Sequence, residues 1–329
     1  MAARCYARSS RGAALAVAGA ATRAASEDSY RRELPVSGRS SVLSALALVL
    51  ALGVLGTLTF VVKAGPAALT AAPGAPALAN QDSGITVEFF GWSHYRLTSP
   101  SGKVVVTNPY IVGNPDAAIT LDEANALRTD LILIADGHQD EVGQSVEIAK
   151  ATGAPVIVPT GELRSWFEDK GVPAAQLIAA NPGSFHVQDG IRVQILHSIH
   201  SSGARTPGEP LYYGGIAGSY MITFENGYTV YFSGSSAATM DMQWWGELYK
   251  PDLVIQHMAG NREPRDAAMA VKFLGTNNPN LKTVFPHHHR IQAQPGSARP
   301  ADLRAAMQQM DLRQEFVEPV PLRPYSVSR

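Results

Sequence analysis

Three short clusters of polar residues in this chain have the composition of a metal-binding site. Residues 135–141 read ADGHQDE, so four of these seven residues carry a carboxylate or an imidazole. Residues 197–200 and 287–289 together hold five of the nine histidines of the chain. The single cysteine, Cys5, excludes a cysteine-based zinc site and an iron–sulfur cluster. A metal in this protein must therefore be held by histidines and carboxylates.

Each cluster directly follows a run of residues that predicts a buried strand. These runs, rich in aliphatic and aromatic side chains, are 130–135, 191–196 and 282–285. Ligands bind where strands end in sheets of this kind, so we expect the three clusters to share one site. A metal there would act as a Lewis acid and lower the pKa of a bound water to about 7. The alternative is three separate surface loops with solvated histidines.

Strand and helix patterns along the chain repeat in two halves. Short runs typical of antiparallel strands open each half: 85–90, 95–98 and 103–107 in the first, and 185–187, 191–196, 219–225 and 229–233 in the second. Alternating strands and helices follow in both halves. This order predicts an α/β fold, a four-layer αββα sandwich in which two sheets pack face to face with helices outside. We place this domain at residues 85–315 and a C-terminal tail at 316–329.

The N-terminal part of the chain predicts a membrane segment ahead of this domain. Residues 1–40 form a basic leader with seven arginines, residues 41–62 carry no charge, and residues 63–84 form an Ala/Pro/Gly linker. A helix of about 22 residues spans about 33 Å, which is enough to cross a bilayer, so we predict a transmembrane or signal-anchor helix at 41–62. The positive-inside rule then places the globular domain on the non-cytoplasmic side of a membrane. The alternatives are a leader cleaved after Ala79 and an organellar transit peptide.

The order of the motifs resembles the metallo-β-lactamase superfamily, and within it the small metal-dependent hydrolases that include the L-ascorbate-6-phosphate lactonases. That family shows [Thr/Ser]-His-x-His-x-Asp-His after a strand, then His-Ser-Ser, Tyr-x-x-Gly-Asp-[Thr/Ser] and Pro-x-His-Tyr at later strand ends. The matching segments here are 135–141, 200–202, 231–236 and 286–289. The resemblance implies the same αββα sandwich.

The resemblance also implies a divalent metal centre of one or two ions, with zinc, manganese or iron as candidates. The implied ligands are Asp136, His138, Asp140, Glu141, His200 and His288. Carboxylates at two of these positions, 136 and 141, replace histidines of the family, which shifts the preference from zinc towards harder metals. We expect Asp136, His138 and His200 to hold one ion, and the other three residues to form a second group.

Two further residues bear on the number of ions. Ser235 stands where the family has the aspartate that bridges two metals, and a serine hydroxyl is a poor ligand without charge. The loss of this bridge weakens the case for two ions held close together. His257 ends another predicted strand at a position where the family has proline, so it is a candidate additional ligand.

The implied function is a metal-dependent hydrolase of a small-molecule substrate. A metal-activated water, oriented by Asp140 as the catalytic residue, would attack an ester, lactone or phosphoester bond. The altered ligands leave a second hypothesis, a catalytically inactive family member that serves as a membrane-anchored binding or scaffold module. A third, a serine hydrolase built on Ser235, lacks the Gly-x-Ser-x-Gly turn. The formal net charge of −1 shows no excess of basic residues of the kind that binds nucleic acid.

Overall fold

The computed structural model describes residues 84–205 and 208–329. Except for residue 84, the predicted leader, membrane segment and linker lie outside the described residues. No helix within the two described stretches has the length and apolar character needed to span a bilayer.

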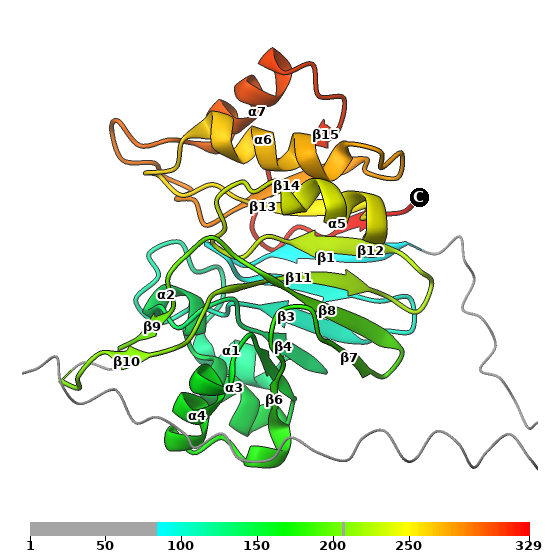
Figure 1. Cartoon of the computed structure of the whole chain (residues 1–329). Coiled ribbons are helices and arrows are strands. Elements are labelled where there is room, and N and C mark those ends of the chain that lie inside the picture. Colours follow the sequence, from blue (N-terminus) through cyan, green and yellow to red (C-terminus); the bar gives the residue numbers. More distant parts are fainter. Residues whose placement is uncertain (1–83, 206–207) are drawn as a thin grey trace, which may run out of the picture. The chain divides into compact units, whose positions relative to one another are not determined.

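The described residues form two seven-stranded sheets, shown in Figure 1. The first sheet has the strand order β16-β1-β2-β3-β4-β5-β6. Its strands are β1 (Ile85–Phe89), β2 (Tyr95–Thr98), β3 (Val104–Thr107), β4 (Leu131–Leu133), β5 (Val156–Val158), β6 (Leu177–Ala179) and β16 (Tyr325–Val327). Strands β1 to β3 are antiparallel, whereas β3 to β6 are parallel and are joined by helices. The carboxyl ends of the parallel strands therefore lie at one edge of the sheet.

The second sheet repeats this plan with the order β15-β14-β13-β12-β11-β8-β7. Its strands are β7 (Phe185–Gln188), β8 (Ile191–His197), β11 (Gly218–Thr223), β12 (Thr229–Phe232), β13 (Leu253–His257), β14 (Thr283–His287) and β15 (Glu315–Phe316). An antiparallel part, β7 to β12, leads into parallel pairing from β12 to β15. A separate two-stranded ribbon, β9 (Gly203–Ala204) and β10 (Tyr212–Tyr213), follows the end of β8.

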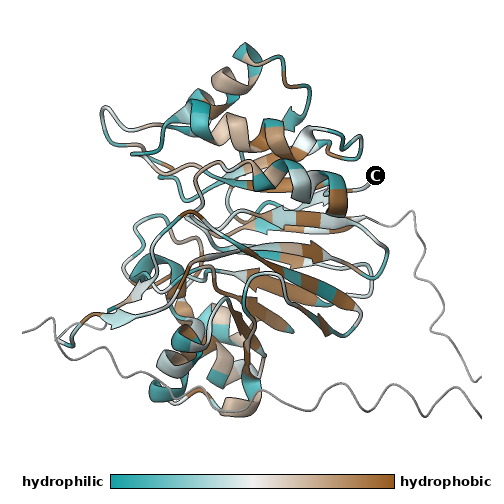
Figure 2. Ribbon diagram, viewed as in Figure 1, coloured by the Kyte–Doolittle hydropathy of each residue, from teal (hydrophilic) through white to brown (hydrophobic). Residues whose placement is uncertain are grey.

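The main core lies between the inner faces of the two sheets, where Figure 2 shows apolar residues. On β1, every second residue (Ile85, Val87 and Phe89) is buried in this core, as the period of a strand requires. The inner face of the second sheet contributes large side chains such as Tyr220 and Phe232. This packing joins the two halves of the chain into one structure.

Helices cover the outer face of each sheet. On the first sheet they are α1 (Leu121–Ala126), α3 (Ser145–Thr152) and α4 (Gly161–Asp169), with the short α2 (Gln139–Val142) and the 3₁₀ turn η1 (Ala174–Gln176) beside them. On the second sheet they are α5 (Asp241–Tyr249), α6 (Pro264–Gly275) and α7 (Pro300–Gln309). The two-sheet α/β fold predicted from the sequence is confirmed, with helices outside both sheets.

The prediction of a C-terminal tail at 316–329 was wrong. Strand β16 pairs antiparallel with β1, with Val327 opposite Ile85, and so forms the edge of the first sheet. Tyr325 packs its ring against Phe285 of the second sheet at 5.4 Å. The segment is short and rich in proline, so its own pattern does not predict a strand, and pairing with β1 decides its conformation.

Candidate metal centre

The loop after β4 is held in place by the second sheet. The backbone N–H of Gly218 on β11 donates to the carbonyl of Ala135 at 2.7 Å. Gly137 then passes close to β9, since a Cβ at this position would lie 2.9 Å from the backbone nitrogen of Ala204. A larger residue would push the loop away from β9. These contacts explain why a glycine follows Asp136. They also hold the loop at the edge of the sheets where the strands end.

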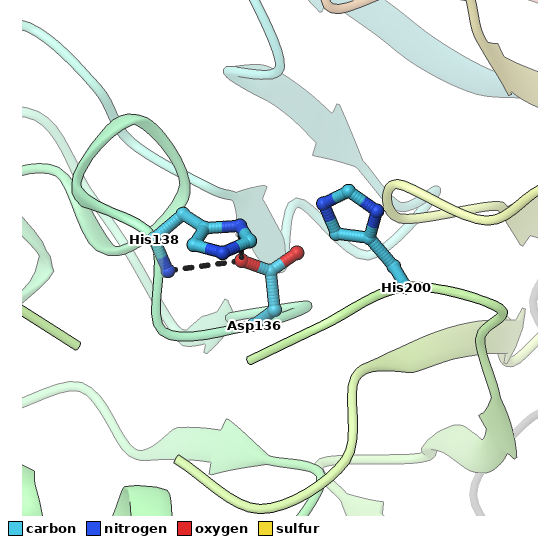
Figure 3. A group of neighbouring side chains, drawn as sticks. All are labelled: Asp136, His138 and His200. Atoms are coloured by element: carbon cyan, nitrogen blue, oxygen red, sulfur yellow. Dashed lines mark hydrogen bonds and ion pairs between the residues drawn. The ribbon is translucent and has the colours of Figure 1, made fainter. Parts of the chain in front are cut away.

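Asp136, His138 and His200 form the first group of the site (Figure 3). Each offers one ligand atom, and the three atoms lie within 4.8 Å of one another. Oδ1 of Asp136 lies 3.0 Å from Nδ1 of His138 and accepts a hydrogen bond from the backbone N–H of His138 at 2.9 Å. The hydrogen bond to Asp136 raises the pKa of His138, whereas burial lowers the pKa of His200.

The second oxygen of Asp136 shows that this group fits a cation. Asp136 is fully buried, and its Oδ2 has no hydrogen-bond partner within the described residues. A buried carboxylate oxygen without a partner is unfavourable, whereas a cation would satisfy it. Two imidazoles and one carboxylate also match the donor types that divalent zinc, iron and manganese accept. The residues present therefore fit one divalent ion.

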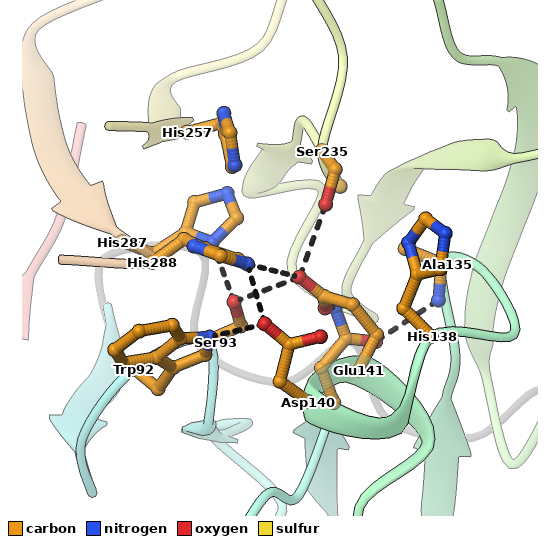
Figure 4. A network of polar contacts seen from close by, with 12 residues as sticks. Trp92, Ser93, Ala135, His138, Asp140, Glu141, Ser235, His257, His287 and His288 are labelled. Atoms are coloured by element: carbon orange, nitrogen blue, oxygen red, sulfur yellow. Dashed lines mark hydrogen bonds and ion pairs between the residues drawn. The ribbon is translucent and has the colours of Figure 1, made fainter. Parts of the chain in front are cut away.

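Glu141 and His288 belong to a second, separate group (Figure 4). Glu141 lies on α2 and is fully buried. Its Oε1 accepts hydrogen bonds from Ser93 at 3.2 Å and from Ser235 at 3.0 Å, and it lies 3.2 Å from Nε2 of His288. Its Oε2 accepts a hydrogen bond from Asn108. Since a carboxylate offers about four acceptor positions, protein donors already satisfy Glu141.

Asp140 is the third member of this second group, and its side chain lines the cavity described below. Its Oδ2 accepts a hydrogen bond from Nε1 of Trp92 at 3.2 Å and lies 3.3 Å from Nε2 of His288. Burial acts to raise the pKa of Asp140, but the bond with His288 outweighs it, and the pKa lies below its usual value. Burial likewise acts to lower the pKa of His288, yet Asp140 and Glu141 together raise this pKa to about 10. Burial raises the pKa of Glu141 to about 7, whereas Asp140 stays ionised, so His288 is an imidazolium paired first of all with the carboxylate of Asp140.

The backbone at this point is strained. Trp92 and His288 are non-glycine residues with φ of 59° and 60°, in the left-handed region. The N–H of His288 donates to the carbonyl of Trp92 at 2.7 Å, so a hydrogen bond links the two strained residues. Strain of this kind, on the order of 1–3 kcal/mol for each residue, persists where surrounding contacts fix the chain and is concentrated at functional sites.

Both groups open into one cavity of about 730 Å³. It is lined by His138, Asp140, His200, Ala237, His257, Ala259, Asn261, Arg262, Glu263, Asp266 and His288. This volume falls in the range of about 300–1,000 Å³ that holds small-molecule ligands. Among the described residues, one group of three histidines or acidic residues has the spacing of a metal site, and it borders this cavity.

The structure thus divides the six predicted ligands into the two groups expected from the sequence. Four residues of the site were not predicted from the sequence: Trp92, Ser93 and Asn108, which contact the carboxylates, and Arg262, which lines the cavity. Trp92 and Ser93 lie in the turn between β1 and β2, a few residues after a strand end, which resembles the position of the three clusters. Arg262 lies in the loop after β13, five residues beyond His257, and carried no signal of its own.

Comparison with known proteins identifies the family. No family model matches the chain. It is 33% identical over 207 residues to a UPF0173 metal-dependent hydrolase from Chloroflexus aurantiacus, covering 62% of this chain and 82% of the relative. A UPF0173 metal-dependent hydrolase from Koribacter versatilis is 32% identical over 207 residues, covering 62% and 84%. The chain belongs to the UPF0173 metal-dependent hydrolase family.

Solved structures agree with this assignment. The UPF0173 hydrolase described here is similar to Igni18, a metallo hydrolase from Ignicoccus hospitalis, with a TM-score of 0.60 and 25% identity over 74% of this chain and 99% of that one. The metallo-β-lactamase fold protein YhfI from Bacillus subtilis has the same fold, with a TM-score of 0.54 and 12% identity over 74% and 100% of the chains. The superfamily resemblance is confirmed, while the lactonase branch stays a prediction.

Proposed function

We propose that this UPF0173 hydrolase uses a single divalent ion, held by Asp136, His138 and His200, to hydrolyse an ester, lactone or phosphoester bond of a small molecule. The observation that carries the proposal is the buried, unpartnered Oδ2 of Asp136 beside two imidazoles that border the cavity. When bound, a divalent ion supplies Lewis acidity, which polarises the bond to be cleaved and favours the ionisation of water.

Asp140 has the position and charge to orient the attacking water. Its side chain lines the cavity, and its lowered pKa keeps it a carboxylate at neutral pH. A carboxylate fixed by Trp92 and His288 can accept a hydrogen bond from water in one defined direction and then take up the proton that the water releases. We assign this role to Asp140.

The second group acts as an ion pair and not as a second metal site. Glu141 already accepts from Ser93, Ser235, Asn108 and His288, so binding another cation would require the loss of several buried hydrogen bonds. The imidazolium of His288 supplies positive charge between the acidic groups of Asp140 and Glu141. One ion per chain is the expected content.

Metal analysis of the purified full chain tests the proposal. The protein is stripped with a chelator, reloaded with zinc, manganese or iron(II), and assayed by elemental analysis and with chromogenic esters and phosphodiesters. We expect one equivalent of metal, chelator-sensitive turnover, and loss of both in His200→Ala. His186→Ala, a change on the edge strand β7, is the matched control. A protein without stoichiometric metal, or turnover that survives chelation, contradicts the proposal and favours the inactive alternative.

The location of the enzyme is proposed from residues 1–62 alone. The charge-free segment 41–62 behind a basic leader favours a membrane-anchored or exported protein, with the catalytic domain on the non-cytoplasmic side. Protease treatment of intact cells and of lysed cells tests this, since only an exported domain is cleaved in both.

A further inference from the structure

His257 occupies a distinctive position on the wall of the cavity. It is the last residue of β13, at the edge where the strands end, and it is only 3% exposed. Its ring centroid lies 4.7 Å from that of His288 and 6.5 Å from that of His200. His257 therefore lies between the two groups of the site, as Figure 4 shows for its position beside His288.

Arg262 fixes the position of the proton on this ring. Nε of Arg262 donates to Nδ1 of His257 at 3.1 Å. A guanidinium can only donate hydrogen bonds, so Nδ1 must act as the acceptor and carries no proton. A neutral imidazole with an unprotonated Nδ1 carries its proton on Nε2.

The guanidinium is itself held at two further points. One terminal nitrogen of Arg262 donates to the backbone carbonyl of Ser235 at 2.8 Å, and another lies 3.5 Å from Oδ2 of Asp266 in the first turn of α6. The carbonyl of Ser235 and Asp266 at the start of α6 thus fix the orientation of the guanidinium group that faces His257. A half-turn of the ring about the Cβ–Cγ bond would put Cδ2 in place of Nδ1 and lose the bond from Arg262.

This arrangement changes the role expected of His257. An imidazole nitrogen binds a metal through its lone pair, and a protonated Nε2 has none to offer. In this tautomer neither nitrogen of His257 has a free lone pair to offer a metal, since Nδ1 accepts from Arg262 and Nε2 carries the proton. Within residues 84–205 and 208–329, no group accepts a hydrogen bond from Nε2, and the side chain lines the cavity. The N–H of Nε2 is available to a ligand in the cavity.

We propose that His257 donates a hydrogen bond from Nε2 to the carbonyl or phosphoryl oxygen of the substrate, and that Arg262 is the positioning residue that keeps the proton there. The inference rests on the proposed function, because it assigns a contact within the same reaction. A donor fixed in advance at the oxygen that gains negative charge stabilises the transition state more than the ground state. The proton remains on His257 throughout, and no bond to the imidazole forms or breaks.

Nitrogen NMR of the full chain labelled with ¹⁵N-histidine tests the tautomer without any assay of activity. The signals of His257 are identified by their loss in His257→Gln. We expect the Nε2–H tautomer in the wild type, both before and after metal is added, and a shift towards a mixture of the two tautomers in Arg262→Leu. An Nδ1–H tautomer in the wild type, or a metal-induced shift that marks coordination through Nε2, overturns the inference.

Kinetics and metal content of a matched pair test the contact with the substrate. We expect His257→Leu and His257→Gln to keep the metal content of the wild type. The leucine variant should lower kcat about 100- to 1,000-fold with a smaller effect on KM, and the glutamine variant, whose amide can donate, should recover part of the rate. His186→Gln controls for a histidine change on β7.

The two proposals fail in different ways. A wild type that takes up no metal and cleaves none of the substrates contradicts the proposed function, and with it the substrate contact. A metal-loaded, active wild type whose kcat is unchanged in His257→Leu overturns only the role of His257. So does a loss of metal in His257→Gln, because it would make His257 a ligand.

Discussion

Nε2 of His288 lies 3.2 Å from Oε1 of Glu141, which links the end of β14 in the second sheet to α2 beside the first sheet. Glu141 is fully buried and His288 borders the cavity, and Ser93 and Ser235 donate to the same oxygen of Glu141. The pair therefore joins the two sheets beside the cavity that His138 and His200 also line. The charges of Glu141 and His288 therefore affect the electrostatic potential of the whole site.

Replacing Glu141 by glutamine is expected to destabilise the fold without removing the metal. The change leaves the imidazolium of His288 with Asp140 as its one carboxylate partner and places an amide where several donors converge. Breaking a buried ion pair from one side costs about 3–5 kcal/mol, so a loss of roughly 3 kcal/mol in the free energy of unfolding is expected. Urea denaturation and elemental analysis of Glu141→Gln measure both quantities.

The control for this change is Glu162→Gln, a substitution in the first turn of α4 at an exposed residue. We expect it to alter the free energy of unfolding by less than about 0.5 kcal/mol. A fall in metal content of Glu141→Gln, with stability unchanged, would instead place a second ion at Glu141.

A substitution of Gly137 tests how the loop of the site is held. A Cβ at Gly137 would lie 2.9 Å from the backbone nitrogen of Ala204, so the loop or β9 must move. We expect Gly137→Ala to lower stability by about 1–3 kcal/mol and to weaken metal binding, because Asp136 and His138 flank the shifted residue. Calorimetric titration of the stripped protein with zinc measures the affinity.

Gly161→Ala is the matched control. Gly161 opens α4, and a Cβ added there meets no atom within 4 Å. This alanine is expected to leave metal affinity unchanged and to be neutral or stabilising by up to about 1 kcal/mol. Equal metal affinities for the two alanine variants would show that the close approach to β9 does not position the ligands.

Sequence patterns were sufficient for most of the sandwich and for bringing Asp136, His138 and His200 together in one group. Side chains alternate between buried and partly buried along β1, which has one face in the core, and β4 is apolar throughout because both its faces are buried. Both patterns can be read from the sequence alone. The contact of Glu141 with His288 depends on how the ends of two sheets meet, and no local pattern records that. Asn108, whose φ of 38° turns its amide towards Glu141, could not be found for the same reason.

The stability of the protein should fall in mild acid because of His94. This residue directly precedes β2 and is buried, and burial lowers its pKa from 6.5 to about 3. Below about pH 6.5 the unfolded chain binds a proton that the folded chain excludes, so the contribution of His94 is present above pH 6.5 and is lost as the pH falls towards 3. At pH 5 the loss from this one group is about 2 kcal/mol.

Other buried histidines follow the same trend, so the test is a difference between two proteins. Burial lowers the pKa of His289 to about 4 and that of His287 well below its usual value. His94→Leu removes one of these groups and keeps an apolar side chain beside Phe90, which packs edge-on against the ring of His94 at 5.0 Å. In urea denaturation from pH 7.5 to 4.5, the stability of His94→Leu should rise relative to that of the wild type as the pH falls. Parallel curves for the two proteins would mean that His94 takes up a proton in the folded state as readily as in the unfolded state.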